Sequence, residues 1–275
     1  MSYFGLKDEN GESKVSYGSY LRIDELTGLQ KVLSDPAQHD EMLFIVVHQV
    51  FELWFKQMLH EVDAVIRRMH AGEALGAQRL LRRCIEIQRV LIAQLKVLET
   101  MTPNDFLTFR DHLMPASGFQ SAQFRALEFV SGIKTARHLE NYPADSVERR
   151  MLEARMASES LSDALYALMR ERGFNAPMPG SADDNAHETR IRALLSIYSD
   201  PDANYDLYLL CEELIEYDEM FTLWRFHHVA MVERMIGSKP GTGGSPGAAY
   251  LRRTVDQRFF PELWEMRTHL SDRTA

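Results

Sequence analysis

Two adjacent histidines, His227 and His228, lie inside an apolar run that ends in glycines, FTLWRFHHVAMVERMIGSKPGTGG (221–244). If the run is helical, His228 faces the same side as Trp224 and other apolar residues, because residues three or four apart share a helix face. His227 falls on a mixed face that also carries Arg234. We therefore expect His228 to point into the protein and His227 to be partly exposed.

His48 also falls on an apolar helical face, together with Phe44 and Phe55. A histidine in such a place is more often a hydrogen-bonded core residue than a metal ligand. Neutral imidazole is nevertheless a good ligand for iron, zinc and copper. The two imidazoles expected to point towards an aromatic interior are therefore candidate ligands of a metal cofactor.

The spacing of the histidines disfavours two classes of metal site. A di-iron helical bundle uses Glu-x-x-His pairs, and none of the ten histidines has a glutamate three residues before it. A zinc protease helix needs HExxH, but the stretch HEVDA (60–64) has Ala64 in place of the second histidine. What remains is a cofactor that needs few protein ligands and a large aromatic pocket, as a b-type haem with one axial histidine does.

The stretch FLTFRDHLMPASGFQS (106–121) contains the first candidate substrate-binding residues. Arg110 shares a helical face with Phe106, and a turn with Ser117 and Gly118 follows. Such an arginine usually lies over its aromatic neighbours as a surface side chain. It could also bind a ligand carboxylate through two parallel hydrogen bonds.

A second candidate loop is KPGTGGSPGAAYL (239–251). It lacks the Gly-Lys-Ser/Thr ending of a phosphate-binding loop, which excludes that kind of nucleotide site. Its glycines allow the close backbone approach that an active-site lid needs, although a disordered connector would have the same composition. Thr242 is its only hydroxyl residue with glycine on both sides.

Helices must position these residues, because apolar residues recur at spacings of three and four and several alternating strand patterns are not found. Thr102 followed by proline is typical of a helix start. The pattern predicts helices at 39–69, 73–99, 122–130 and 205–235, with a short one after Thr102. In the second of these, the residues expected to face inward are Leu80, Leu81, Ile85, Ile87, Val90, Leu91, Leu95 and Leu98.

These patterns predict an all-α fold in which long antiparallel helices form a central bundle with smaller peripheral helices. Residues 131–186 are richer in charge, proline and serine, so we expect 131–200 to be a more peripheral helical region. The whole chain, 1–275, is expected to be a single domain.

Composition excludes several classes of function. A formal net charge of −9, from 31 Lys and Arg against 40 Asp and Glu, disfavours nucleic-acid binding. Charges interrupt every apolar stretch, and the first residues lack the pattern of a signal peptide, so we expect a cytoplasmic protein with no membrane partner. Cys84 and Cys211 are far apart and outside any CxxC spacing, which favours two reduced core thiols.

Five blocks of this sequence resemble the tryptophan 2,3-dioxygenase family closely. They follow the family's order and span most of the chain, and the weakest similarity is at 131–200. The blocks are YGSYLRIDELTGLQ (17–30), HDEMLFIVVHQVFELWFKQ (39–57), VLETMTPNDFLTFRDHLMPASGFQSAQFRALEF (97–129), LWRFHHVAMVERMIGSKPGTGGSPGAAYL (223–251) and FFPELWEMR (259–267).

The resemblance implies an all-helical enzyme with haem b, ferrous in the active state. Such an enzyme inserts both atoms of O2 across the C2–C3 bond of L-tryptophan, which gives N-formylkynurenine in the first step of the kynurenine pathway. Members of the family look like homotetramers. By the same resemblance, the N-terminal segment, 1–30, contacts a neighbouring subunit.

The resemblance also implies roles for individual residues. His228 matches the axial iron ligand, and His48 matches the distal residue that hydrogen-bonds the indole N–H, which positions the substrate without acting as an essential base. Arg110 matches the residue that binds the substrate carboxylate. The other residues implied to surround substrate and haem are Phe44, Phe106, Leu113, Ser117, Gly118 and Thr242, with Tyr17, Tyr20 and Leu21 from a neighbouring subunit.

Phe106 stands where some bacterial relatives have tyrosine, and we expect activity to survive that change.

Three other functions remain open from the sequence. An indoleamine dioxygenase would usually have a small hydroxyl residue at the position of His48. A haem-based gas sensor or haem carrier would leave Arg110 and the Thr242 loop unexplained, and a plain helical interaction protein would bind no haem.

Overall fold

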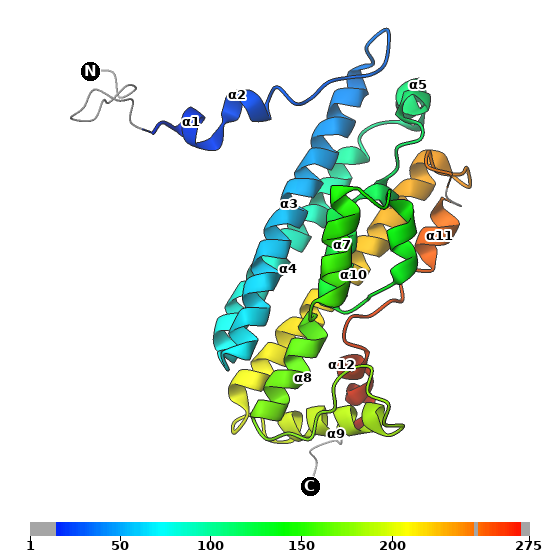
Figure 1. Cartoon of the computed structure of the whole chain (residues 1–275). Helices are drawn as coiled ribbons and strands as arrows, with labels where there is room; N and C mark the ends of the chain where they lie inside the picture. The colour runs from blue at the N-terminus through cyan, green and yellow to red at the C-terminus, as the bar shows by residue number, and fades with distance from the viewer. Residues whose placement is uncertain (1–14, 245–246, 271–275) are drawn as a thin grey trace, which may run out of the picture.

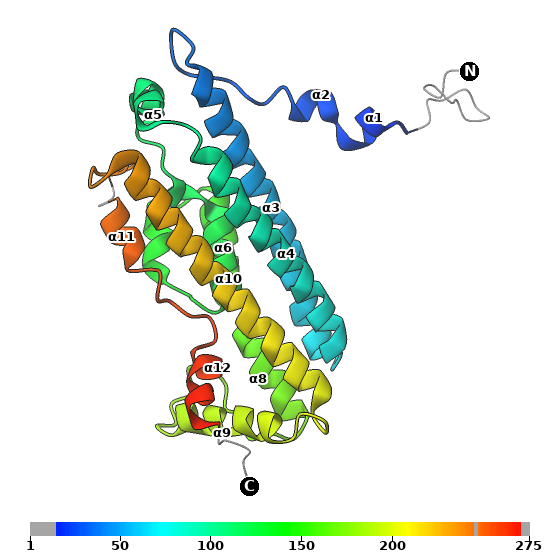
Figure 2. The same cartoon turned by 180° about the vertical axis from the view of Figure 1, so that it is seen from behind.

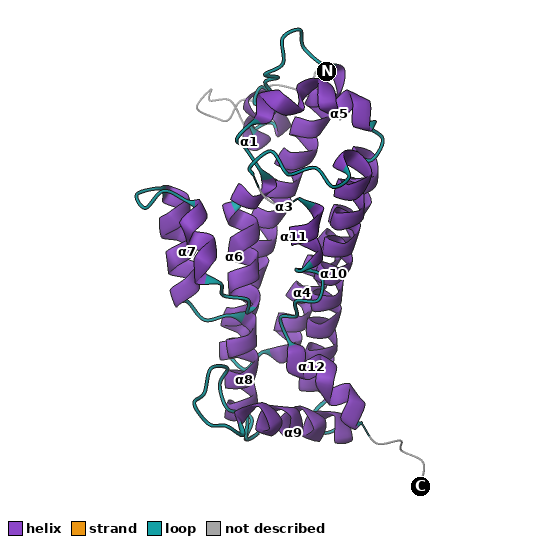
Figure 3. Ribbon diagram, turned by 90° about the vertical axis from the view of Figure 1, so that its right-hand side faces the viewer, coloured by secondary structure: helices purple, strands orange, loops and turns teal. Residues whose placement is uncertain are grey.

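Three long helices run side by side along most of the molecule: α3 (His39–His70), α4 (Ala74–Leu98) and α10 (Tyr205–Ile236) (Figures 1 and 2). The computed structural model describes residues 15–244 and 247–270, and this part of the chain is helical without a strand (Figure 3). Helix α4 packs against both α3 and α10. The expected all-α bundle is confirmed.

Shorter helices surround the three long ones. Helices α6 and α8 pack against α3, α7 packs against α6, and α11 packs against α10. Helix α9 crosses the end of the bundle and contacts α12 (Figure 1). The remaining elements are α1 (Tyr17–Leu21), α2 (Ile23–Leu26), α5 (Pro103–Phe109), η1 (Arg110–Leu113), η2 (Gly118–Gln120), α6 (Ala122–Ser131), η3 (Ala136–Asn141), α7 (Val147–Ala157), α8 (Leu161–Glu171), α9 (Ala186–Ser199), α11 (Ala248–Arg252), α12 (Pro261–Glu265) and η4 (Met266–His269).

Local sequence signals account for the ends of these helices. Thr102 caps α5 through a hydrogen bond from the backbone N–H of Asp105, whose carboxylate accepts in return from the N–H of Thr102. Pro103 takes the first position of that helix, where it needs no N–H partner. Gly72, with φ of 73°, forms the tight turn that reverses the chain between α3 and α4.

The inward face predicted for α4 is right with one exception. Seven of its eight predicted residues are buried, but Val90 is 46% exposed and faces away from the core. Val97, seven residues further along the same face of α4, is also 49% exposed, and such partly apolar surfaces are normal in folded proteins.

Two helices within 131–200 contribute to the core of the protein. In α8, Leu161, Leu165 and Leu168 are at most 1% exposed, and in α9, Leu194 and Ile197 are fully buried. Helix α7, by contrast, buries only Leu152. The charge and proline content of this region belongs mainly to α7 and to the loops on either side of α8.

Helix α3 is long and apolar enough to cross a bilayer by length and composition alone. Core helices of soluble proteins pass the same test, so this is weak evidence for a membrane span. Here α3 packs against α4, α6 and α8. Its buried residues join a core cluster that also contains residues of α4, α8 and α10.

The described part of the N-terminal segment, residues 15–30, projects away from the bundle (Figures 1 and 2). Its two short helices, α1 and α2, bury no residue. Residues 1–14 of the predicted subunit-contacting segment lie outside the described residues.

Candidate active site

A cavity of about 270 Å³ opens between the first half of α3 and the second half of α10. The end of α4, helices α5, α6 and α11, the turn at 117–121 and the loop before α11 also contribute to its wall. Most of its lining is apolar. A concave, largely apolar cavity with a few polar groups is the usual form of a small-molecule site.

His228 lines this cavity and His227 does not. The imidazole of His228 stacks on Trp224, with the ring planes 7° apart and the centroids separated by 5.0 Å. Burial, with a smaller contribution from His48, lowers the pKa of His228 to about 4. At neutral pH its ring is therefore uncharged and has a nitrogen lone pair available, and no described residue hydrogen-bonds it. His227 instead contacts the exposed ring of Phe226.

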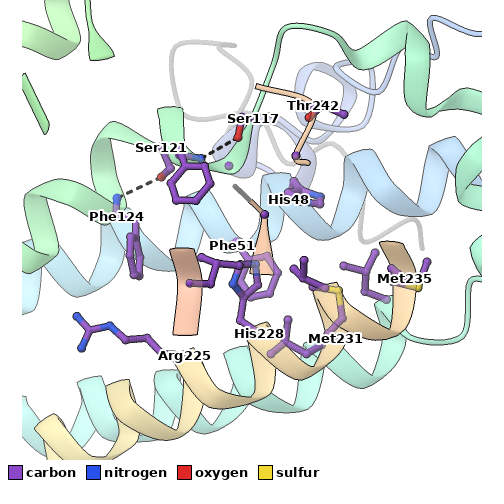
Figure 4. A pocket seen from close by; sticks show the side chains of 18 of the residues that line it. His48, Phe51, Ser117, Ser121, Phe124, Arg225, His228, Met231, Met235 and Thr242 are labelled. Carbon is purple, nitrogen blue, oxygen red and sulfur yellow. Dashed lines mark hydrogen bonds between the residues drawn. The ribbon is translucent and has the colours of Figure 1, made fainter. Parts of the chain in front are cut away.

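His48, from α3, also lines the cavity (Figure 4). Its Nδ1 lies 2.7 Å from the carbonyl oxygen of Phe44. A carbonyl only accepts hydrogen bonds, so Nδ1 carries the proton and Nε2 is left as an acceptor. Burial lowers the pKa of His48, which favours this neutral form.

Aromatic rings form the wall next to His48. Phe44 lies 4.0 Å from the His48 ring, centroid to centroid, and contacts Phe106 and Phe109. Phe51 lies between His48 and Trp224 and meets both rings edge-on. These flat surfaces suit planar aromatic ligands, which pack face-to-face or edge-to-face against them.

The glycine-rich loop lies against the turn that follows η1. The Arg110 guanidinium donates to the carbonyl oxygen of Pro240 at 2.5 Å, and the Thr242 hydroxyl donates to the carbonyl oxygen of Ala116 at 2.5 Å. A Cβ on Gly243 would lie 2.5 Å from the Cβ of Ser117, so the loop packs this closely only because Gly243 has no side chain. Residues 245 and 246 of the predicted loop lie outside the described residues.

The structure brings eight of the twelve predicted site residues together around the cavity. The eight are Phe44, His48, Phe106, Arg110, Ser117, Gly118, His228 and Thr242. Leu113 packs partly buried against the core without lining the cavity. Tyr17 and Tyr20 are 76% exposed and Leu21 is 41% exposed, all on α1.

The sequence analysis missed a buried charged cluster at the other end of the cavity from Thr242 (Figure 4). Glu128 of α6 pairs with Arg125 of the same helix and with Arg225 of α10, at 3.0 Å for the second pair. All three side chains are at most 7% exposed, and together they carry one net positive charge. In the sequence, Arg125 and Glu128 interrupt the apolar run QFRALEF and Arg225 interrupts LWRFHH, and this pattern could have indicated the cluster.

Four buried N–H donors around this cavity have no hydrogen-bond acceptor among the described residues. They are the Nε atoms of Arg110, Arg125 and Arg225 and the indole nitrogen of Trp224. A buried donor without a partner destabilises a protein by about 1 to 3 kcal/mol. The cavity therefore suits a ligand that brings acceptors, in particular carboxylates.

Comparisons with known proteins agree with this architecture. The family model described as tryptophan 2,3-dioxygenase matches residues 5–179 and 185–270. A protein named tryptophan 2,3-dioxygenase from a Nocardioides species is 48% identical over 94% of this chain and 96% of its own. Proteins of the same name from Anaeromyxobacter dehalogenans and Bacillus cereus are 46% and 43% identical, over 92% and 94% of this chain and 95% and 94% of theirs. This chain, with its cavity between two long helices that each contribute an imidazole, belongs to the tryptophan 2,3-dioxygenase family.

Proposed function

We propose that this chain is a haem-dependent dioxygenase that inserts both atoms of O2 across the C2–C3 bond of the indole of L-tryptophan. The product is N-formylkynurenine, the first intermediate of tryptophan degradation by the kynurenine pathway. The family membership supports the reaction. The observation that carries the assignment of the site is the uncharged imidazole of His228 in the same cavity as four unpaired N–H donors.

The residues around the cavity fit haem b. His228 would hold the iron through its free ring nitrogen, since neutral imidazole is an axial haem ligand. The Arg125, Glu128 and Arg225 cluster, with its net positive charge and unpaired Nε atoms, would accept a group that carries carboxylates, as this porphyrin does. Bound here in its ferrous state, the haem supplies the activation of O2.

The chain itself binds and orients the substrate. Arg110 binds the tryptophan carboxylate once the guanidinium exchanges its bond to Pro240 for the charged group, and Thr242, on the same loop as Pro240, would contact the amino-acid head group. At the other end of the substrate, Nε2 of His48 accepts the indole N–H. Two fixed ends convert binding energy into orientation of the C2–C3 bond.

His48 does not remove the indole proton in this proposal. Its pKa is lowered by burial, whereas an indole N–H is a far weaker acid than an imidazolium, so complete transfer would be steeply uphill. The ring of Phe44 beside His48 lines the indole site, and Phe106 adds apolar wall without a hydroxyl. Ser117 and Gly118 lie where the closing loop meets the cavity, which helps to exclude water.

We further propose that the whole chain acts as one domain in a cytoplasmic homotetramer. Residues Tyr17, Tyr20 and Leu21 would complete the cavity of a neighbouring subunit. The exposed aromatic and aliphatic side chains of α1 support this, because a five-residue helix is not stable in water without packing partners.

An absorption spectrum and a turnover assay test the proposed function. The purified protein reconstituted with haem should show a Soret band and, under air, should convert L-tryptophan into a product with the absorbance of N-formylkynurenine. Tryptamine, which lacks the carboxylate that Arg110 binds, should be a poor substrate. A Soret band without any product would favour a haem sensor or carrier, and equal use of tryptamine would favour an indoleamine dioxygenase.

The two adjacent histidines provide a matched pair of variants for the iron ligand. His228→Ala should lose the Soret band or alter the iron coordination, while His227→Ala should keep both, because only His228 lines the cavity. A wild-type spectrum for His228→Ala would exclude the proposed ligand.

A further inference from the structure

Glu41, in the first turn of α3, has a fully buried carboxylate. It accepts hydrogen bonds from the backbone N–H of Leu33 at 2.6 Å and of Ser34 at 3.0 Å, and from the Ser34 hydroxyl. The Ser34 oxygen accepts in turn from the N–H of Gln38 at 2.9 Å. One carboxylate thus fixes the connector immediately before α3.

These hydrogen bonds stabilise the ionised form of the Glu41 carboxyl group. Burial acts to raise its pKa, but the hydrogen bonds from Ser34 and Leu33 outweigh this effect and hold the pKa below its usual value. Both amides belong to the connector and neither belongs to α3, so the carboxylate constrains the connector and does not cap the helix.

The segment that leaves this connector has little other contact with the bundle. Gln30 donates to the side chain of Gln49 at 2.5 Å, which gives a second attachment to α3. Beyond Gln30, the segment presents apolar side chains to solvent. Val15, Tyr17 and Tyr20 are 76 to 77% exposed, and Leu29 is 62% exposed.

We infer that Glu41 is a positioning residue for the neighbouring subunit's cavity, because it sets the direction in which residues 15–30 leave the bundle. This inference rests on the proposal that Tyr17 and Tyr20 complete a cavity in trans. The bonds from Leu33 and Ser34 to Glu41 and the bond from Gln30 to Gln49 are the attachments of this connector to α3, so a shift of Leu33 and Ser34 changes the path of residues 15–30. Glu41 then acts on substrate binding in a site that it does not touch.

Glu41→Gln tests the inference, because the amide keeps the size of the side chain but loses its charge and one acceptor. We expect the KM for L-tryptophan to rise by roughly tenfold, as when a binding group loses its preorganisation, with the Soret band and the oligomeric state unchanged. Hydrogen exchange at the amides of Leu33 and Ser34 should become faster. Asp40→Asn is the matched control, since Asp40 has the same place in the helix dipole but its nearest ionic partner is His39 at 3.9 Å.

Mixed oligomers separate an effect in trans from a local effect on α3. Co-expressed chains carrying Glu41→Gln and His228→Ala form assemblies in which only the first chain can turn over. In the assemblies in which its cavity receives an intact N-terminal segment from the second chain, KM should return towards the wild-type value, so an excess of the second chain should increase the recovery. No recovery of KM would show that Glu41 acts within its own subunit, through the nearby start of α3, and would overturn the inference.

A double-mutant cycle provides a second test of whether Glu41 acts through the N-terminal segment. If Glu41 acts through the segment, adding Glu41→Gln to Tyr20→Ala should raise KM little further, because the residue that it positions is already gone. Fully additive effects would contradict this. If the wild-type enzyme forms no N-formylkynurenine, the proposed function fails, whereas unchanged exchange at Leu33 and Ser34 in Glu41→Gln would overturn the anchoring role by itself.

Discussion

At the scale of single residues, the hydrogen bond from His48 to the Phe44 carbonyl decides which ring nitrogen faces the cavity. Only the neutral ring can accept the indole N–H at Nε2, because protonation turns that nitrogen into a donor. In the proposed substrate complex, the role of His48 therefore depends on a backbone carbonyl one helical turn away as much as on the histidine itself.

The affinity for tryptophan should depend on pH through His48. Burial lowers the pKa of His48 below its usual value of 6.5, so the neutral form persists below that pH. KM should stay constant from pH 8 to about 6.5 and should rise on further acidification, because His48 then becomes protonated. The substrate carboxylate does not cause this rise, since it remains ionised until about pH 4. A KM that already rises above pH 7 would contradict the lowered pKa, and steady-state kinetics at constant ionic strength measure it.

Arg110→Ala should raise the KM for L-tryptophan by about ten- to a hundredfold, since a hydrogen bond to a charged group is worth about 1.5 to 3 kcal/mol. The haem content should stay the same, because Arg110 lies at the loop end of the cavity. Tryptamine serves as the control substrate, and its KM should change little. An unchanged affinity for tryptophan would exclude the carboxylate role.

The sequence predicted single residues well where helical periodicity applies and poorly where charge pairs form across elements. The orientation of His228 towards the interior follows from its apolar face. The pairing of Arg225 with Glu128 could not be predicted, because the two residues lie 97 positions apart and only the packing of α6 near α10 brings them together. The role of Glu41 was missed for the same reason, since the loop that it binds has no regular pattern.

At the scale of elements, the loop at 239–244 packs against the turn at 114–118 through Gly243. Gly243→Ala should raise KM for tryptophan and weaken the closed form of the loop, because the added Cβ would meet Ser117 at 2.5 Å. Adding Ser117→Gly should restore much of the loss by removing the opposing Cβ. Kinetics and the rate of proteolysis in the loop measure the effect, and an unaffected Gly243→Ala variant would show that the loop does not close in this way.

The long helices were predictable to within about one residue at their ends. The run without Gly or Pro at 205–235 became α10 (Tyr205–Ile236), and 39–69 became α3 (His39–His70). Burial was harder to predict for α8 (Leu161–Glu171), which lies in a polar region of sequence yet packs against α3 and α6. Composition averaged over a long window hides a short amphipathic helix, because its apolar face is diluted by the loops around it.

At the scale of the whole molecule, Glu128 ties α6 to α10 across the cavity. Glu128→Gln should lower the free energy of unfolding of the haem-free protein by about 3 to 5 kcal/mol, because two buried guanidiniums lose their common counter-charge. The loss should be smaller with haem bound, whose carboxylates offset part of the charge. Denaturation with urea measures both values.

Glu153→Gln is the control for this variant. Glu153 pairs with Arg149 on the surface of α7 and is 49% exposed, so its removal should change stability by less than about 1 kcal/mol. Equal effects for the two glutamates would show that the buried cluster contributes no more than an ordinary surface pair.

The stacking of Trp224 on His228 gives the protein an internal optical reporter. Of the three tryptophans, Trp224 lines the cavity, whereas Trp54 and Trp264 do not. Haem bound beside this indole would quench its fluorescence by energy transfer. The decrease in tryptophan fluorescence during a titration with haem therefore measures the fraction of occupied cavities without any label attached to the protein.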